Sequence, residues 1–423
     1  MTTVTDAAAA TVAAVSNAAS SGGDTHAMVS KIILQLLLAF AAAKLVGYIF
    51  EKIKQPVVIG ELLAGVIMGP YVFNVLQLND PSMHLTFEVI AEVAVILLLF
   101  SIGLETKLSD LAKVGLKAFW TALGGVLLPF VLGFVYMKMT GHNDIMSMFM
   151  GAIMVATSVG ITARLLKDLN FMSEEVSRIV IGAAVIDDIL GLIVLSVVSG
   201  LAEKNTISIA AIAATIAVIV VFLLIFTLGG VHFNSKYGYR IGKIKVRNAP
   251  LIFGSVICFT YAVVAVQIGL AAIVGAFMAG VVMAERESEF EVREKLEILE
   301  DVLVVFFFVI MGAKVNIAAF TDPSILIAGL IITVLAFAGK FFGSALPVVG
   351  MGIKKASFIG MAMVPRGEVG IIIAAFALSK GIIDDRFYGI AILMVLLTTL
   401  IPPFILSPMI KSLKNKTIRD NHL

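Results

Sequence analysis

The chain has 423 residues, of which 60% are hydrophobic and only 14% are charged. Soluble domains have about 45–50% apolar and about 25% charged residues, so these proportions exclude an ordinary soluble protein and indicate a surface that faces lipid. The net charge of +2 gives no basic excess for binding nucleic acid. A single cysteine excludes internal disulfides and cysteine-rich metal sites.

Apolar runs of about 20 residues, the length that crosses a bilayer as a helix, recur along the chain. They do not alternate with a period of two, which disfavours a β-barrel. We therefore predict an all-α polytopic membrane protein with about thirteen transmembrane helices. The predicted helices span residues 31–50, 57–75, 86–105, 114–138, 147–166, 176–201, 206–230, 249–266, 269–284, 301–319, 324–349, 355–379 and 386–410.

The placement of basic residues predicts the orientation of these helices. Most of the 31 lysines and arginines fall in connections on the same side as the C-terminus. Because basic loops remain in the cytoplasm, we expect the N-terminus outside and the C-terminus inside a bacterial cytoplasmic (inner) membrane. The Ala-, Ser- and Thr-rich N-terminal segment lacks the basic start of a signal peptide, and we expect it to be a disordered tail.

The chain resembles itself at an offset of about 210–215 residues. Gly60–Met68 matches Gly275–Met283, and Val159–Ile161 matches Val369–Ile371. The matched helices are seven apart, an odd number that reverses their orientation, as in the inverted repeats of many secondary transporters. The expected domains are a disordered N-terminal tail (residues 1–30), inverted repeat 1 with helices 1–6 (31–201), a linker helix 7 with a cytoplasmic loop (202–248), inverted repeat 2 with helices 8–13 (249–410) and a cytoplasmic tail (411–423).

Helices 5 and 12 carry residues that interrupt helices at positions that the repeat relates. Helix 5 contains Ala156-Thr-Ser-Val-Gly-Ile-Thr162, and helix 12 contains Val364-Pro-Arg-Gly-Glu-Val-Gly370. Irregular backbone at membrane depth is tolerated only where it packs inside protein or lines a cavity. We therefore predict that helices 5 and 12 are discontinuous and cross each other.

Five charged residues lie near the middle of otherwise apolar helices, where each costs roughly 2.5–3.5 kcal/mol. They are Asp187, Asp188, Lys340, Arg366 and Glu368. Two adjacent carboxylates repel each other, so the aspartate pair is suited to take up a proton or a hard metal cation. Lys340 is the counter-charge in the other repeat. Arg366 and Glu368 could neutralise the facing dipole ends of the interrupted helices, or they could pair with each other.

Other features are less informative or exclude further classes of protein. Glu61 and Arg164 are expected to form local salt bridges or to lie at interfaces. No Walker A sequence appears, which leaves ATP-driven pumping by this chain without support. No candidate catalytic histidine or cysteine lies in a predicted helix beside a partner, so we expect a protein that is not an enzyme and has no cofactor.

Four stretches resemble the monovalent cation/proton antiporter superfamily, specifically its second cation/proton antiporter family. They are Leu97–Glu105, Ala184–Gly191, Ile273–Gly280 and Pro365–Glu368. The sequence looks most similar to sodium/proton antiporters of the NapA type. This resemblance implies an NhaA/NapA-like fold, a homodimer, and a six-helix core domain that moves like an elevator against a dimerisation domain.

The resemblance also implies roles for individual residues. Asp188 would be the main carrier of the cation and the proton, and Asp187 would pair with Lys340. Thr157 and Ser158 would lie near the ion.

We therefore expect a secondary active antiporter, electrogenic by charge count, that exchanges Na⁺ or Li⁺ for H⁺ in pH homeostasis. Its partners would be monovalent cations, protons and the lipid bilayer. Glutathione-gated potassium efflux proteins of the same family usually carry a Gln-Asp pair and a nucleotide-binding domain, and neither is expected here. A potassium/proton antiporter, a sodium-coupled symporter of an organic solute and a channel remain as alternatives.

Overall fold

A computed structural model describes residues 2–53, 55–204, 209–230, 249–284, 292–315 and 322–421. All regular elements within these ranges are helices. Those of the first half are α1 (Thr2–Lys52), α2 (Val57–Met68), α3 (Pro81–Leu104), α4 (Leu108–Met139), α5 (Asp144–Ile153), α6 (Val159–Asp168), α7 (Glu175–Lys204), α8 (Ile209–Leu224) and the π-helix η1 (Ile225–Gly229). Those of the second half are α10 (Ala249–Gln267), α11 (Ala272–Ala284), α13 (Val292–Ala313), α14 (Pro323–Ala345), the 3₁₀-helix η3 (Leu346–Met351), α15 (Ile353–Ala362), α16 (Glu368–Ser379) and α17 (Asp385–Asn421).

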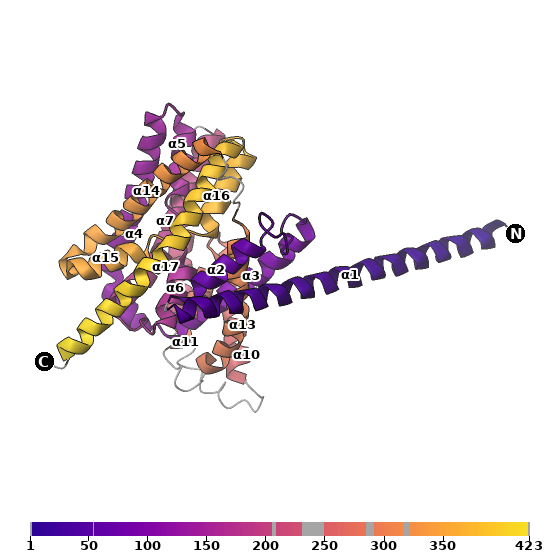
Figure 1. The fold of residues 1–423 in the computed structure, drawn as a ribbon, viewed down its shortest axis with the longest axis horizontal. Helices are drawn as coiled ribbons and strands as arrows, with labels where there is room; N and C mark the ends of the chain where they lie inside the picture. Colours follow the sequence, from indigo (N-terminus) through magenta and orange to yellow (C-terminus); the bar gives the residue numbers. More distant parts are fainter. Residues whose placement is uncertain are drawn as a thin grey trace.

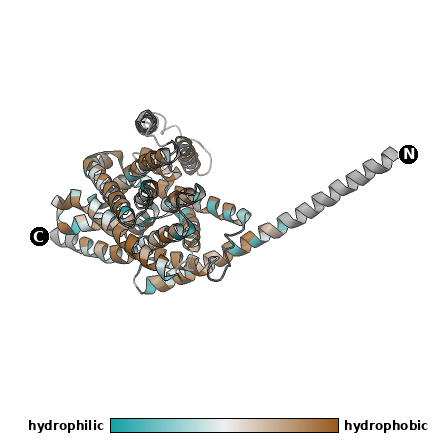
Figure 2. Ribbon diagram, turned by 90° about the horizontal axis from the view of Figure 1, so that it is seen from above, coloured by the Kyte–Doolittle hydropathy of each residue, from teal (hydrophilic) through white to brown (hydrophobic). Residues whose placement is uncertain are grey.

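The helices have the length and surface of a membrane bundle. Among the described residues, seven helices are long and apolar enough to cross a bilayer, and four shorter helices are also apolar. Hydrophobic residues cover the outside of the bundle as well as its interior (Figure 2). Large apolar side chains are exposed along α1, α4, α10 and α14, as at Leu45, Leu116, Val263 and Val334. A helix that is apolar on every face suits a lipid environment.

The first helix is longer than the predicted membrane span of residues 31–50. α1 begins at Thr2 and ends at Lys52 (Figure 1), and the disordered tail expected over residues 1–30 stays a prediction. The segment is rich in alanine, which has the highest intrinsic helix propensity. Apolar content alone therefore underestimated the length of this helix.

The second helix is shorter than predicted. α2 ends at Met68, although the apolar run continues to residue 75. Gly69 caps the helix with a hydrogen bond from its N–H to the carbonyl of Gly65, and Pro70 follows directly. Proline has no N–H to continue a helix, which explains the early end.

The helices form two packing groups. In the chain, α8 lies between α7 of one group and α10 of the other. α1, α2, α3, α10, α11 and α13 form a group that we call the scaffold group. α4, α5, α6, α7, α14, α15, α16 and α17 form a second group that we call the core group. The principal helix pairs recur in the two halves of the chain: α1 packs on α2 as α10 packs on α11, and α4 packs on α7 as α14 packs on α17.

Glycines at repeat-related positions allow close approach of helices in the scaffold group. A Cβ at Gly65 of α2 would lie 2.8 Å from the carbonyl carbon of Val309 in α13. A Cβ at Gly280 of α11 would lie 2.7 Å from the Cα of Gly103 in α3. Only glycine fits such backbone contacts. The matching motifs of the two halves therefore make equivalent contacts.

Candidate functional site

Two helix interruptions meet inside the core group. α5 gives way to α6 over residues 154–158, the first interruption, and α15 gives way to α16 over residues 363–367, the second interruption. The N–H of Ser158 donates a hydrogen bond of 2.8 Å to the carbonyl of Pro365. Backbone groups that a continuous helix would satisfy internally are therefore paired between the two interruptions.

Close packing of α14 on α4 brings Lys340 to these interruptions. A Cβ at Gly339 would lie 2.8 Å from the Cα of Pro129, and one at Gly343 would lie 2.8 Å from the carbonyl carbon of Gly124. The two glycines flank Lys340, whose side chain is fully buried. The helices can approach only because these positions carry no side chain.

Lys340 joins the first interruption to one of the paired aspartates. Its Nζ donates to Oδ1 of Asp187 at 2.6 Å and to the carbonyl of Val155 at 2.8 Å. Asp187 is buried as well. A buried ion pair is stable only when further hydrogen bonds satisfy its charges, and the Val155 carbonyl provides one.

Arg366 bonds to the same region from the second interruption. Its guanidinium donates through NH1 to the carbonyl of Ala156 and through NH2 to that of Ala336, each at 2.9 Å. The first interruption follows the C-terminus of α5, where the helix dipole is negative, so two cations, Lys340 and Arg366, lie where they are electrostatically favourable. Glu368 begins α16, and its side chain is outside the part of the chain whose side chains the structure describes.

Asp188 borders a small cavity at the same place. Asp187, Asp188 and Ala156 line this cavity, whose volume is about 60 Å³. This volume has room for a small cation with a few waters. Next to Ala156, the buried hydroxyls of Thr157 and Ser158 have no hydrogen-bond partner among the described atoms. Carboxylates, hydroxyls and carbonyls are the oxygen ligands that hard cations take.

The described residues contain no cluster of three or more His, Cys, Asp or Glu side chains that could hold a metal ion. A cation held at the aspartate pair would therefore need neutral oxygens as its further ligands.

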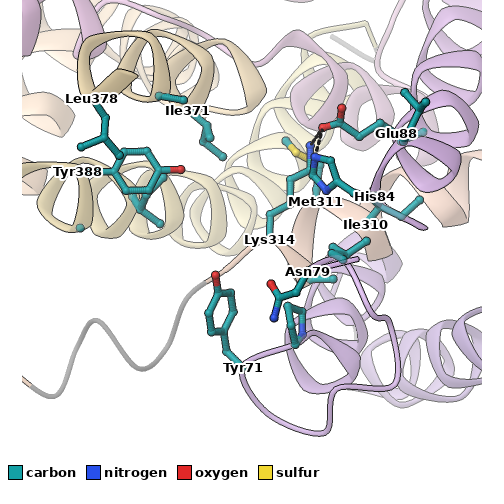
Figure 3. Close-up of a pocket in the computed structure, with 18 of the residues that line it drawn as sticks. Tyr71, Asn79, His84, Glu88, Ile310, Met311, Lys314, Ile371, Leu378 and Tyr388 are labelled. Carbon is teal, nitrogen blue, oxygen red and sulfur yellow. Dashed lines mark hydrogen bonds and ion pairs between the residues drawn. The ribbon is translucent and has the colours of Figure 1, made fainter. Parts of the chain in front are cut away.

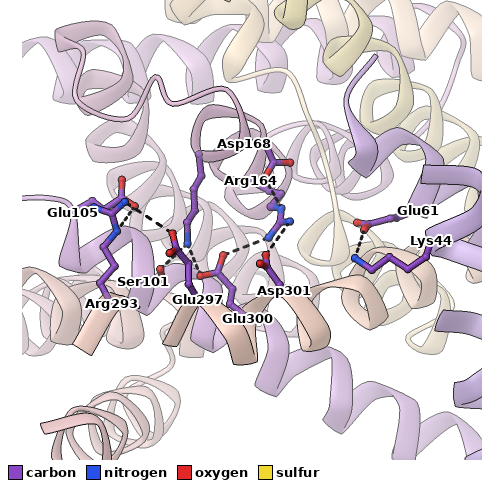
Figure 4. A network of polar contacts seen from close by, with 11 residues as sticks. Lys44, Glu61, Ser101, Glu105, Arg164, Asp168, Arg293, Glu297, Glu300 and Asp301 are labelled. Atoms are coloured by element: carbon purple, nitrogen blue, oxygen red, sulfur yellow. Dashed lines mark hydrogen bonds and ion pairs between the residues drawn. The ribbon is translucent and has the colours of Figure 1, made fainter. Parts of the chain in front are cut away.

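A network of ion pairs ties the two groups together at one end of the bundle (Figure 4). Glu300 of α13 is fully buried and accepts from Lys167 Nζ at 2.5 Å, with Arg164 NH1 at 3.4 Å. Lys167 also donates to the hydroxyl of Ser101 in α3 at 2.8 Å. Arg164 pairs within its own helix with Asp168 at 2.9 Å. α6 of the core group is therefore bound to α3 and α13 of the scaffold group.

A cavity of about 890 Å³ separates the two groups at the opposite end, where α3 begins and α13 ends (Figure 3). α3 and α13 line one side, and α16 and α17 line the other. Glu88 lies at its wall and pairs with Lys314 at 2.7 Å and with His84 at 3.3 Å. The groups are thus apart at one end of the bundle and tied at the other.

Several of these residues do not stand out in the sequence. Glu300 lies in a run of charged residues at 285–301, yet it is buried; its position one residue before an apolar span was an available signal. The backbone carbonyls of Val155, Ala156 and Ala336 carry no signal in the sequence, because any residue type provides a carbonyl. Glu61 pairs with Lys44 at 3.7 Å, a local salt bridge.

Comparison with known proteins identifies the family. The family described as "Sodium/hydrogen exchanger, transmembrane" matches residues 36–412. The chain is 33% identical over 408 residues to the high-affinity Na⁺/H⁺ antiporter NhaS3 of Synechocystis, with 88% of each chain covered. It is 31% identical to the Na⁺/H⁺-K⁺ antiporter GerN of Bacillus cereus, covering 90% of this chain and 96% of that one.

A solved structure shares the fold. The structure of the sodium proton antiporter MjNhaP1 from Methanocaldococcus jannaschii matches with a TM-score of 0.61 at 20% identity, covering 90% of this chain and 99% of that one. The expectation of an all-helical, multi-pass membrane protein with an antiporter fold is confirmed at this level. The chain is a transporter rather than an enzyme, and it belongs to the transmembrane sodium/hydrogen exchanger family of the monovalent cation/proton antiporters.

Proposed function

We propose that this chain exchanges Na⁺ or Li⁺ for H⁺ at the Asp187–Asp188 pair by secondary active transport. One observation carries the proposal: a buried Asp187–Lys340 ion pair adjoins Asp188 at a small cavity beside two helix interruptions. Intramembrane ionisable groups are expensive and mark ion or proton pathways.

The site suggests how cation and proton compete. Asp188 binds either a cation or a proton, so occupation by one excludes the other. A cation at the pair weakens the attraction between Asp187 and Lys340, and the ammonium then loses its proton more easily because its counter-charge is shared. Two protons exchanged for one sodium ion would make the exchange electrogenic. Arg366 and Glu368 would balance the dipole ends of the interrupted helices.

The packing supports an elevator mechanism of the NapA type. We propose thirteen membrane helices, with α5–α6 and α15–α16 as the crossing pair, and two inverted repeats whose equivalent helix pairs recur in both halves. The core group would slide against the scaffold group, which would form the interface of a homodimer. With the N-terminus outside the cytoplasmic membrane, the cavity of about 890 Å³ opens outward and the Glu300 network closes the cytoplasmic side.

The collapse of a pH gradient in proteoliposomes with Na⁺, Li⁺ or K⁺ tests this function. We expect Na⁺ and Li⁺ to release the gradient at lower concentrations than K⁺. The name of the relative GerN, a Na⁺/H⁺-K⁺ antiporter, favours K⁺ as a second candidate substrate. Equal responses to K⁺ and Na⁺ would support that alternative, and no response to any of the three cations would refute antiport.

The role of Lys340 has its own measurement. Lys340→Gln removes the titrating ammonium, so we expect any remaining exchange to be electroneutral and insensitive to membrane potential. Lys138→Gln is the matched control, because Lys138 lies near the end of α4 and pairs with the exposed Asp144. Electrogenic exchange by Lys340→Gln would contradict the proposed stoichiometry.

A further inference from the structure

The hydroxyl of Thr399 leaves its own helix. Threonine in a membrane helix usually donates to a carbonyl three or four residues earlier in the same helix. Thr398 does so, with the carbonyls of Met394 and Val395 as acceptors. Its neighbour Thr399 instead donates to the backbone carbonyl of Arg366 in the second interruption. The contrast between adjacent, buried threonines indicates a specific contact rather than a default of the helix.

The Arg366 carbonyl needs such a donor. It lies between α15 and α16, so neither helix supplies an N–H to it, and a buried carbonyl without a partner is costly. The neighbouring carbonyls are paired in the same way: Pro365 accepts from the N–H of Ser158, and Ala362 accepts from the hydroxyl of Thr162. Donors from α17, from the first interruption and from α6 thus pair with the second interruption or its flank.

The guanidinium of Arg366 contacts the backbone close to the Asp187–Lys340 ion pair. The guanidinium bonds to Ala156, which lines the small cavity, and to Ala336, one helical turn before Lys340 on α14. Its position therefore fixes both the first interruption and the part of α14 that presents Lys340 to Asp187.

We infer that Thr399 is a positioning residue of the exchange site, which rests on the proposed function. Its hydroxyl fixes the backbone at Arg366, and the guanidinium in turn holds the carbonyls of the first interruption and α14. Without this hydroxyl, Arg366 and Lys340 keep their charges but lose a fixed geometry. The cation would then bind less tightly, while the number of transporters able to complete a cycle would change little.

The test compares three variants in proteoliposomes: Thr399→Val, Thr399→Ser and Thr398→Val. The net worth of one buried hydrogen bond predicts that Thr399→Val raises the KM for sodium about fivefold, with Vmax within about twofold of the wild type. Thr399→Ser keeps the hydroxyl and should restore the wild-type KM. Thr398→Val removes an equally buried hydroxyl that bonds within α17, so its KM should be unchanged. A loss of Vmax with unchanged KM in Thr399→Val would show a merely structural role and overturn the inference.

Amide hydrogen exchange in detergent separates this inference from the proposed function. Peptides that cover the second interruption should exchange faster in Thr399→Val than in the wild type or in Thr398→Val. Equal exchange in all three proteins would overturn the positioning role even if sodium/proton exchange is present. If the wild type exchanges no monovalent cation, the proposed function fails, and faster amide exchange would still support the contact through which Thr399 acts.

Discussion

Replacement of Glu300 by glutamine should shift the protein away from the state in which the cavity of about 890 Å³ is open. Glu300 of α13 is buried between Lys167 and Arg164 of α6. It therefore joins the scaffold group to the core group only in a state in which α13 and α6 are in contact. Removing one partner of a buried ion pair costs about 3–5 kcal/mol. Lys167 keeps Ser101 and Arg164 keeps Asp168, so we expect about 2 kcal/mol, or about 30-fold in the equilibrium.

Labelling of a cysteine in this cavity measures the shift. Cys258 is the only cysteine of the chain and is buried, so Cys258→Ser gives a suitable background. Ala375 is an exposed residue of α16 that lines the cavity, and Ala375→Cys places the label there. If the two states are similarly populated in the parent protein, Glu300→Gln should slow labelling by a membrane-impermeant maleimide by about tenfold.

The control and the refuting result are both direct. Glu297 lies one turn earlier on α13 and contacts Arg293 of the same helix at 4.0 Å, so Glu297→Gln should leave labelling unchanged. If Glu300→Gln is folded and labels at the rate of the parent protein, the network does not hold the two groups together, and the reasoning is wrong.

Three further substitutions test separate parts of the account. Arg366→Lys keeps the charge but cannot reach the carbonyls of Ala156 and Ala336 together, so the initial rate of sodium-driven proton flux should fall about tenfold; a wild-type rate would contradict the role of the guanidinium. Gly367→Ala would place a Cβ 2.7 Å from Ser158 Oγ, so exchange should be lost, whereas Gly115→Ala on α4 meets no atom within 4 Å and should be active. Asp322 caps α14, and hydrogen bonds from the hydroxyl and amide of Ser324 hold the pKa of its carboxyl below the usual value. Because the pKa of the Asp322 carboxyl is lower in the folded protein, its carboxylate stabilises the fold at pH values above the unfolded pKa of about 3.9, and this stabilisation is lost as the pH falls. Asp322→Ala should therefore lower Tm at pH 7, and the difference in Tm should vanish below about pH 3. A difference that persists in acid would contradict the cap.

The general architecture could be predicted from the sequence because a membrane restricts what each residue can do. Apolar length predicts helices, and glycine or proline at repeat-related positions predicts interruptions near Ser158 and Pro365. A charge inside an apolar membrane helix is costly, so it indicates a functional site, and Asp187 and Lys340 stood out for this reason. The structure brings these two side chains together although they are 153 residues apart in the chain.

The tertiary partners could not be predicted. Arg366 bonds to carbonyls 210 and 30 residues away, and no pattern of side chains marks a carbonyl as an acceptor. The burial of Glu300 could not be predicted either, because it depends on where α6 packs. The start of α1 could not be predicted from apolar length, because alanine favours a helix whether or not the segment lies in a membrane.

The most direct test of the central claim is sodium-driven proton flux by Asp188→Asn in proteoliposomes. Asparagine keeps the size and one oxygen of the side chain, but it carries no charge and cannot bind and release a proton in competition with a cation. We expect Asp188→Asn to lose sodium/proton exchange and Asp144→Asn to retain it, because Asp144 forms an exposed ion pair with Lys138 where α4 ends and α5 begins. Exchange by Asp188→Asn at a rate similar to that of the wild type would contradict the assignment of the paired aspartates as the transport site.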